Sequence, residues 1–297
     1  LRDIRAVLSE TGSTFTPTLV VAAAALIFVG LAFKVSAWPF QVWAPDVYQG
    51  APAPVAAFLS AGPKAAAFAV FLRVFVTALG PIADRWGPLV WASALLTMVI
   101  GNFAALWQSN VKRLLAYSSI AHAGYVLVAL AARSDMGTAA AMFYLAAYAL
   151  MNVGAFTVVG HICGKGERNL EIDDYAGLGV RQPVTAALFT IFLLSLIGVP
   201  LTGGFFGKFY IFRAALRADL IWLTVLGLLT SAVAAYYYLR LIVVMYMHEP
   251  AEAAPQLPAL GGALGAVLWA SALGILALGI YPAIVLEFVN HSASLAR

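Results

Sequence analysis

Eight long apolar runs divide this chain of 297 residues and constrain its fold more than any other feature. A helix of about 20 apolar residues crosses a bilayer. Because lipid cannot hydrogen-bond to the backbone, only helices and closed barrels span it. We therefore predict an all-α integral membrane protein, a multi-helix bundle with about eight transmembrane helices. The runs are 17–38, 54–80, 87–108, 112–132, 137–163, 184–213, 219–247 and 259–282.

The composition supports a membrane protein and argues against several kinds of ligand. The chain is 63% hydrophobic and 10% charged, against about 45–50% and about 25% in soluble domains. Its net charge of +4 comes from scattered basic residues, so we expect no nucleic-acid partner. The single Cys163 and the dispersed histidines predict no metal site. No nucleotide-binding or iron–sulfur motif is present, so we expect no cofactor in this chain.

Short polar segments connect the apolar runs. Residues 1–16 are predicted as a connecting loop and 17–297 as a single multi-pass transmembrane domain. An even number of spans places both ends on one side of the membrane, although the basic residues of the loops are too evenly distributed to give the orientation. Because the chain begins with Leu1 in a loop-like segment, we expect it to be part of a longer protein.

Three lysines lie inside the apolar runs, away from their first and last residues: Lys34, Lys64 and Lys208. A charge at mid-bilayer costs roughly 2.5–3.5 kcal/mol, so an intramembrane lysine indicates function. Burial disfavours the charged form of lysine, which suits it to proton transfer. Twelve of the 13 acidic residues fall in predicted loops or at the first residue of a run, and Glu287 follows the last helix. The lysines are therefore predicted to be neutral for much of the time, or to have their counter-charge elsewhere.

The three lysines differ in how well a purely structural role explains them. Lys34 is near a helix end and can equally extend toward the headgroups. Lys64 lies deep within its span, where that explanation fails. Lys208 follows Pro200, Gly203 and Gly204, which predict a break in helix 184–213 beside a hydrated cavity.

His122 lies near the centre of a predicted span, with Ser118, Ser119 and Tyr125 at helical spacing. Histidine titrates near physiological pH, so this polar stripe is a candidate proton path. The alternative is a hydrogen-bonded core histidine.

Two arginines also lie near helix ends. For Arg73 and Arg240, contact with lipid phosphates or extension toward the headgroups is the better explanation.

Three segments resemble a known family. FKVSAWPFQVWAPDVYQGAPAPVAAFLSAGPKAAAF (33–68), NVKRLLAYSSIAHAGYVLVAL (110–130) and GVPLTGGFFGKFYIF (198–212) are similar to subunit N of the proton-pumping NADH:quinone oxidoreductases, respiratory complex I. That subunit is antiporter-like, and the resemblance covers essentially the whole chain. PDVYQGAPAPV favours subunit N over its paralogues and over Mrp-type antiporters.

The resemblance implies a fold and roles for individual residues. Family members have fourteen helices in two inverted repeats with broken helices, and this chain would match helices seven to fourteen, the C-terminal portion. Lys34 and Lys208 would be the lysines of broken helices and Lys64 the connecting lysine, with the glutamate partner of Lys34 upstream. We expect Lys34, Lys64, Lys208 and His122 to transfer protons.

The resemblance also implies partners and a location. The chain would be a translocase subunit of an enzyme complex in a bacterial inner (plasma) membrane, beside paralogous membrane-arm subunits and the lipid bilayer. NADH, FMN, iron–sulfur clusters and quinone would be in other subunits, with no redox chemistry in this chain. The alternatives are an Mrp-type cation/proton antiporter subunit and a non-pumping assembly scaffold.

Overall fold

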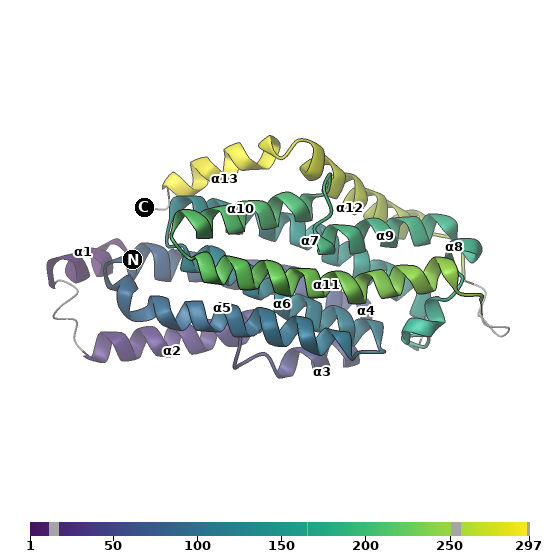
Figure 1. Cartoon of the computed structure of the whole chain (residues 1–297), viewed down its shortest axis with the longest axis horizontal. Helices are drawn as coiled ribbons and strands as arrows, with labels where there is room; N and C mark the ends of the chain where they lie inside the picture. Colours follow the sequence, from purple (N-terminus) through teal and green to yellow (C-terminus); the bar gives the residue numbers. More distant parts are fainter. Residues whose placement is uncertain (12–17, 165, 251–256, 296–297) are drawn as a thin grey trace.

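The computed structural model describes residues 1–11, 18–164, 166–250 and 257–295, and the regular elements in these ranges are helices (Figure 1). A single β-bridge joins Asn110 to Glu171. The helices are α1 (Arg2–Thr11), α2 (Thr18–Val35), α3 (Trp43–Gly50), α4 (Ala53–Phe71), η2 (Leu72–Ala78), η3 (Gly80–Ile82), α5 (Ala83–Leu106), α6 (Val111–Ala131), α7 (Asp135–Cys163), η4 (Ile172–Tyr175), α8 (Leu178–Arg181), α9 (Pro183–Ile197), α10 (Gly203–Arg217), α11 (Ile221–Met247), α12 (Gly262–Ile280) and α13 (Ala283–Leu295).

Seven helical stretches in the described residues are long and apolar enough to cross a membrane. They are α2, α4 with η2, η3 with α5, α6, α7, α11 and α12. The shorter apolar helix α9 is followed by α10, and together they cover the predicted run 184–213. The all-α membrane fold with about eight spans is therefore confirmed. In Figure 1, α1 and the end of α13 lie at the same end of the bundle, as an even number of crossings requires.

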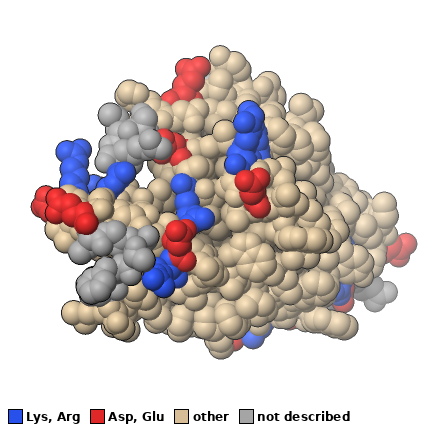
Figure 2. Space-filling model, turned by 60° about the vertical axis from the view of Figure 1, so that its left-hand side comes forward, with Lys and Arg blue, Asp and Glu red and all other residues tan. Residues whose placement is uncertain are grey.

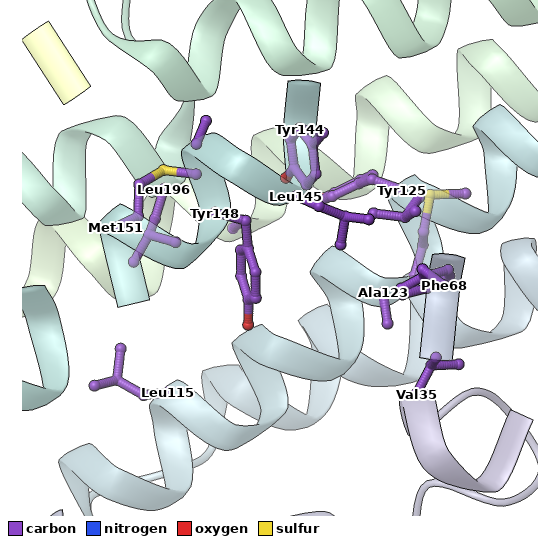
Figure 3. Close-up of a cluster of buried hydrophobic side chains, with 14 of the residues drawn as sticks. Val35, Phe68, Leu115, Ala123, Tyr125, Tyr144, Leu145, Tyr148, Met151 and Leu196 are labelled. Atoms are coloured by element: carbon purple, nitrogen blue, oxygen red, sulfur yellow. The ribbon is translucent and has the colours of Figure 1, made fainter. Parts of the chain in front are cut away.

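Helix α6 is the centre of the bundle, because 94% of its apolar window is buried inside the protein. It packs against α5, α7 and α10. Glycine permits the close approach of α5 to α6: a Cβ on Gly101 would lie 2.6 Å from the backbone nitrogen of Ala121. Small residues at such crossings let membrane helices gain dispersion contacts. The resulting core holds aromatic residues such as Tyr125, Tyr144 and Tyr148 (Figure 3).

Charged side chains gather toward the ends of the bundle. Figure 2 shows clusters of Lys, Arg, Asp and Glu at the end that carries α1, and a broad flank without charged atoms beside it. Large apolar side chains such as Leu26 and Leu229 are exposed on the flanks, at 73% and 59%. In lipid this surface needs no further cover, because the hydrocarbon tails are as apolar as leucine.

The structure corrects the expectation of a loop for residues 1–16. Arg2–Thr11 form α1, an amphipathic helix that buries Leu8 while its neighbouring side chains stay exposed. The helix packs on η2 and η3, which explains why a largely polar segment is ordered as a helix. Residues 12–16 of that expectation lie outside the described part of the chain.

Two further helices of eight or more residues were not predicted. The segment after α2 contains the short helix α3, and the segment after α12 continues as α13, which packs on α7. Both are too short to cross a membrane alone, so the search for long apolar runs misses them.

Candidate functional site

Lys64 is buried at the centre of the bundle, with only 2% of its surface exposed. It lies on α4, and its ammonium donates hydrogen bonds to the carbonyl oxygen of Ser119 on α6, at 2.8 Å, and to the Ser119 hydroxyl. The ammonium is also 6.0 Å from the centre of the Tyr48 ring on α3. Lys64 therefore points into the protein rather than toward a headgroup.

Lys208 lies on α10, directly after the predicted break. α9 ends at Ile197 and α10 begins at Gly203, so the break near Pro200 is confirmed. Helix α9 ends because Gly198 adopts a left-handed conformation, with φ of 91°, a common helix terminus. Pro200 then prevents the helix from resuming.

The lysine satisfies the carbonyls that this break frees. The Lys208 ammonium donates to the carbonyl oxygens of Leu196 at 3.0 Å and Ile197 at 2.8 Å, and to the Ser231 hydroxyl at 2.8 Å. A helix C-terminus carries partial negative charge, so α9 favours an ammonium here. The ammonium also lies 4.9 Å from the centre of the Tyr125 ring, within the range of a cation–π contact. The hydrated cavity expected at this point stays a prediction.

The two glycines predicted to contribute to the break have a different role in the structure. Gly203 and Gly204 lie in the first turn of α10. A Cβ on Gly204 would lie 1.8 Å from the carbonyl oxygen of Ser195. Glycine at 204 thus permits α10 to start directly against the end of α9, and this contact brings Lys208 to the freed carbonyls.

His122 lies between the two lysines, and 2% of its surface is exposed. Its Nδ1 is hydrogen-bonded to the Tyr144 hydroxyl and its Nε2 to the Tyr238 hydroxyl at 3.2 Å. The ring contacts Tyr148, with 5.2 Å between centroids, and Tyr125, at 5.5 Å. The histidine therefore faces the interior of the bundle, not lipid.

Hydroxyl groups extend from Lys64 as far as Tyr148, whose ring contacts that of His122. The Tyr148 hydroxyl donates to the Ser119 hydroxyl at 2.8 Å, and Asn152 donates to Tyr148. In Figure 3 the Tyr148 side chain extends from its helix α7 toward the neighbouring helix. We call the following set the polar line: Lys64, Ser119, Tyr148, His122, Tyr125 and Lys208. It joins α4, α6, α7 and α10 across the middle of the bundle.

The structure does not bring Lys34 into the polar line. Lys34 is exposed at the end of α2, where Ser36 turns the chain with φ of 61° before α3 begins. Within the residues that the structure describes, it has no hydrogen-bond or ion-pair partner. The helix is broken here, as the family resemblance implies, but a role for this lysine stays a prediction.

Sequence reasoning missed a buried ion pair at the end of the bundle opposite α1. Lys112 is fully buried, pairs with Glu167 and donates to the carbonyl oxygen of Ala51 at 2.5 Å. Glu167 also accepts a hydrogen bond from the backbone of Ala53 at 2.7 Å, at the start of α4. The position of Lys112 at the edge of an apolar run was a usable signal, because such a residue is either exposed or paired.

Known proteins match this chain in sequence. The family model described as NADH:quinone oxidoreductase/Mrp antiporter, transmembrane, matches residues 3–234. The chain belongs to this family. It is 70% identical over 278 residues to NADH-quinone oxidoreductase subunit N 1 of Solibacter usitatus, which covers 94% of this chain and 57% of that protein. It is 43% identical over 284 residues to subunit N of Mycobacterium tuberculosis, covering 94% of this chain and 54% of that protein.

Solved structures match the fold. Respiratory complex I from Thermus thermophilus with bound aureothin contains a chain 39% identical to this one, with a TM-score of 0.78, covering 92% of this chain and 60% of that one. A chain of the archaeal membrane-bound sulfane sulfur reductase is 32% identical with a TM-score of 0.85, covering 96% and 58%. In the Mrp complex from Dietzia the identity is 23% and the TM-score 0.85, covering 98% and 63%, which shows the fold alone.

Together these matches define the protein as a multi-pass membrane protein with an antiporter-like helical bundle, similar to subunit N. The chain spans a little over half the length of the curated relatives given above, 57% and 54%.

Proposed function

We propose that this chain translocates protons as a membrane-arm subunit of an NADH:quinone oxidoreductase in a bacterial inner membrane. The observation that carries the proposal is the polar line, which runs between two buried lysines at the centre of the bundle. The similarity to proteins named NADH-quinone oxidoreductase subunit N supports it. Residues 17–297 would correspond to helices seven to fourteen of the family and form a single domain.

In this proposal each lysine holds and releases a proton as the charge beside it changes. Hydroxyl groups can both donate and accept hydrogen bonds, so Ser119 and Tyr148 can pass a proton from Lys64 toward His122. Neutral histidine carries one donor and one acceptor nitrogen and can relay it further. Tyr125 and the hydrated cavity expected beside α9 would complete the path to Lys208.

Electrostatic coupling can drive such a sequence. A like charge brought to about 8 Å changes the energy of a lysine by on the order of 2 kcal/mol at an effective dielectric constant of about 20. That exceeds the free energy of one pKa unit, about 1.4 kcal/mol. A charge change at one end of the line would therefore alter protonation at the next lysine.

The redox chemistry would take place in other subunits of the complex. NADH, FMN, iron–sulfur clusters and quinone would be bound there, and this chain would contact paralogous antiporter-like subunits and lipid. Lys34 would be the first lysine of the path, with a carboxylate from outside the matched helices as its partner. Its exposure on the surface of this chain is consistent with a partner that lies outside it.

Proton flux in lipid vesicles tests the proposal. We expect Lys64→Ala in the assembled complex to reduce both proton pumping and the coupled oxidation of NADH, while the complex still assembles. Arg240→Ala is the matched control, because Arg240 is an exposed helical cation away from the polar line. Wild-type pumping by assembled Lys64→Ala complex would favour a scaffold instead, and flux that required a sodium gradient would favour a cation/proton antiporter.

A further inference from the structure

A cavity of about 780 Å³ opens on the flank of the bundle, away from the contacts of the polar line. Its volume is within the range of about 300–1,000 Å³ for ligand sites. Small side chains from three helices create it: Ala65 and Ala69 on α4, Ala146 and Ala149 on α7, and Ala293 on α13. We call this cavity the flank cleft.

One end of the flank cleft is basic. Arg5, Arg73 and Arg133 line it together with a single carboxylate, Asp135. Arg133 pairs with the exposed Asp84 at 3.0 Å. Arg73 is exposed and forms no hydrogen bond or ion pair within the described residues. Three guanidinium groups and one carboxylate therefore line this end of the flank cleft.

The local backbone explains the position of Arg73. After Phe71 the helix widens into the π-helical segment η2 (Leu72–Ala78), and Arg73 lies at its start. Such π-helical turns occur frequently at functional sites. Arg73 and Thr77, one turn apart, both line the cleft.

The opposite end of the flank cleft is apolar and lies at membrane depth. The cleft follows α7 from Asp135, at its first residue, to Ala149. Fourteen residues of helix correspond to about 21 Å, compared with a hydrocarbon core of about 30 Å. The cleft thus runs from headgroup level to the level of the polar line, because Ala65 and Ala149 directly follow Lys64 and Tyr148 in sequence.

We propose that the flank cleft binds a phospholipid with an anionic headgroup. The headgroup phosphate contacts Arg73 at the basic end, and one acyl chain lies along the alanines of α4 and α7. Arginine matches phosphate oxygens in two-point geometry, and the alanine surface accepts hydrocarbon without desolvating a polar group.

Native mass spectrometry of the assembled, detergent-purified protein tests this proposal, with phosphatidylglycerol and phosphatidylcholine as probes. We expect Arg73→Gln to weaken phosphatidylglycerol binding about fivefold, the factor for one basic side chain near an anionic headgroup. Phosphatidylcholine binding should not change. Arg217→Gln, an exposed arginine at the end of α10 and outside the flank cleft, is the control and should leave both affinities unchanged.

A second pair of variants tests the apolar part. Ala69→Phe places a ring in the flank cleft and should displace phosphatidylglycerol, whereas Ala66→Phe on the same helix should not. Both alanines are exposed, and only Ala69 lines the cleft. Equal binding of the two lipids, equal effects of Arg73→Gln and Arg217→Gln, or retention of phosphatidylglycerol by Ala69→Phe would each overturn the proposal. The last result is also expected if a protein segment occupies the cleft.

Discussion

At the scale of single residues, Lys64 and Lys208 are held by oxygen dipoles rather than by carboxylates. Lys64 donates to Ser119, and Lys208 donates to two carbonyls and to Ser231. A buried carboxylate would fix the charged form of a lysine strongly, and its removal would leave an uncompensated charge. Dipoles hold an ammonium less firmly. The lysines of the polar line can therefore change protonation without the loss of an ion pair.

The hydroxyl of Tyr148 provides a test at this scale. Tyr148→Phe keeps the ring beside His122 but removes the donor to Ser119. We expect proton flux to fall several-fold, while stability decreases by about 1 kcal/mol, the typical net value of a hydrogen bond. Tyr210→Phe is the matched control, because Tyr210 packs against Phe143 outside the polar line. Equal flux in the two variants would exclude the Tyr148 hydroxyl from the path.

At the scale of elements, the break between α9 and α10 places Lys208. Gly198 ends α9, and Gly204 lets α10 start against Ser195. The lysine one turn later then reaches the carbonyls that the break frees. A discontinuous helix is tolerated in a membrane only where such partners exist.

Gly204→Ala tests this arrangement. The added Cβ would lie 1.8 Å from the carbonyl oxygen of Ser195, so the two helices must separate. Overpacking of this kind costs about 1–3 kcal/mol, and the displaced Lys208 should lower proton flux. We expect a lower melting temperature in detergent. Gly30→Ala on α2, where a Cβ meets nothing within 4 Å, should leave the melting temperature and the proton flux unchanged. A similar decrease of either quantity in Gly204→Ala and Gly30→Ala would contradict the account.

The ion pair of Lys112 and Glu167 fixes the start of α4. Glu167→Ala would leave the Lys112 ammonium buried without its carboxylate, which costs about 3 kcal/mol for a buried pair. Asp84→Ala removes an exposed partner of Arg133 and should cost no more than about 1 kcal/mol. Melting temperatures of the two variants in detergent measure the difference. Equal temperatures would mean that the Lys112 pair contributes no more than a surface pair.

The sequence predicts long, uniform elements well and interactions between distant segments poorly. The span over 112–132 and the break near Pro200 follow from hydrophobicity and proline chemistry, and both are present. The partnership of Lys112 with Glu167 and the stacking around His122 depend on helix packing, which no local pattern specifies. The charged residues of α1 suggest a loop when the sequence is read alone. The segment is a helix because it packs on η2 and η3, and no local pattern predicts that contact.

At the scale of the whole molecule, charged side chains gather at the end that carries α1 (Figure 2), whereas the residues of the polar line are buried inside the bundle. In the proposed function, protons moving along this line would travel parallel to the membrane, between a lysine on α4 and a lysine beside the broken helix. The exposed Lys34 lies at the edge of the same chain. Under the proposed function, this arrangement would pass charge sideways between neighbouring modules of an assembly.

The most direct test of this account is proton pumping by the assembled complex with Lys64→Arg. Arginine keeps a positive charge at this position but does not release a proton at any accessible pH. A purely structural or electrostatic role for Lys64 requires only the charge, whereas proton transfer requires its loss and return. We predict that protons pumped per NADH oxidised fall sharply in an assembled Lys64→Arg complex in lipid vesicles. A wild-type ratio in that complex would contradict the central claim that Lys64 carries the proton.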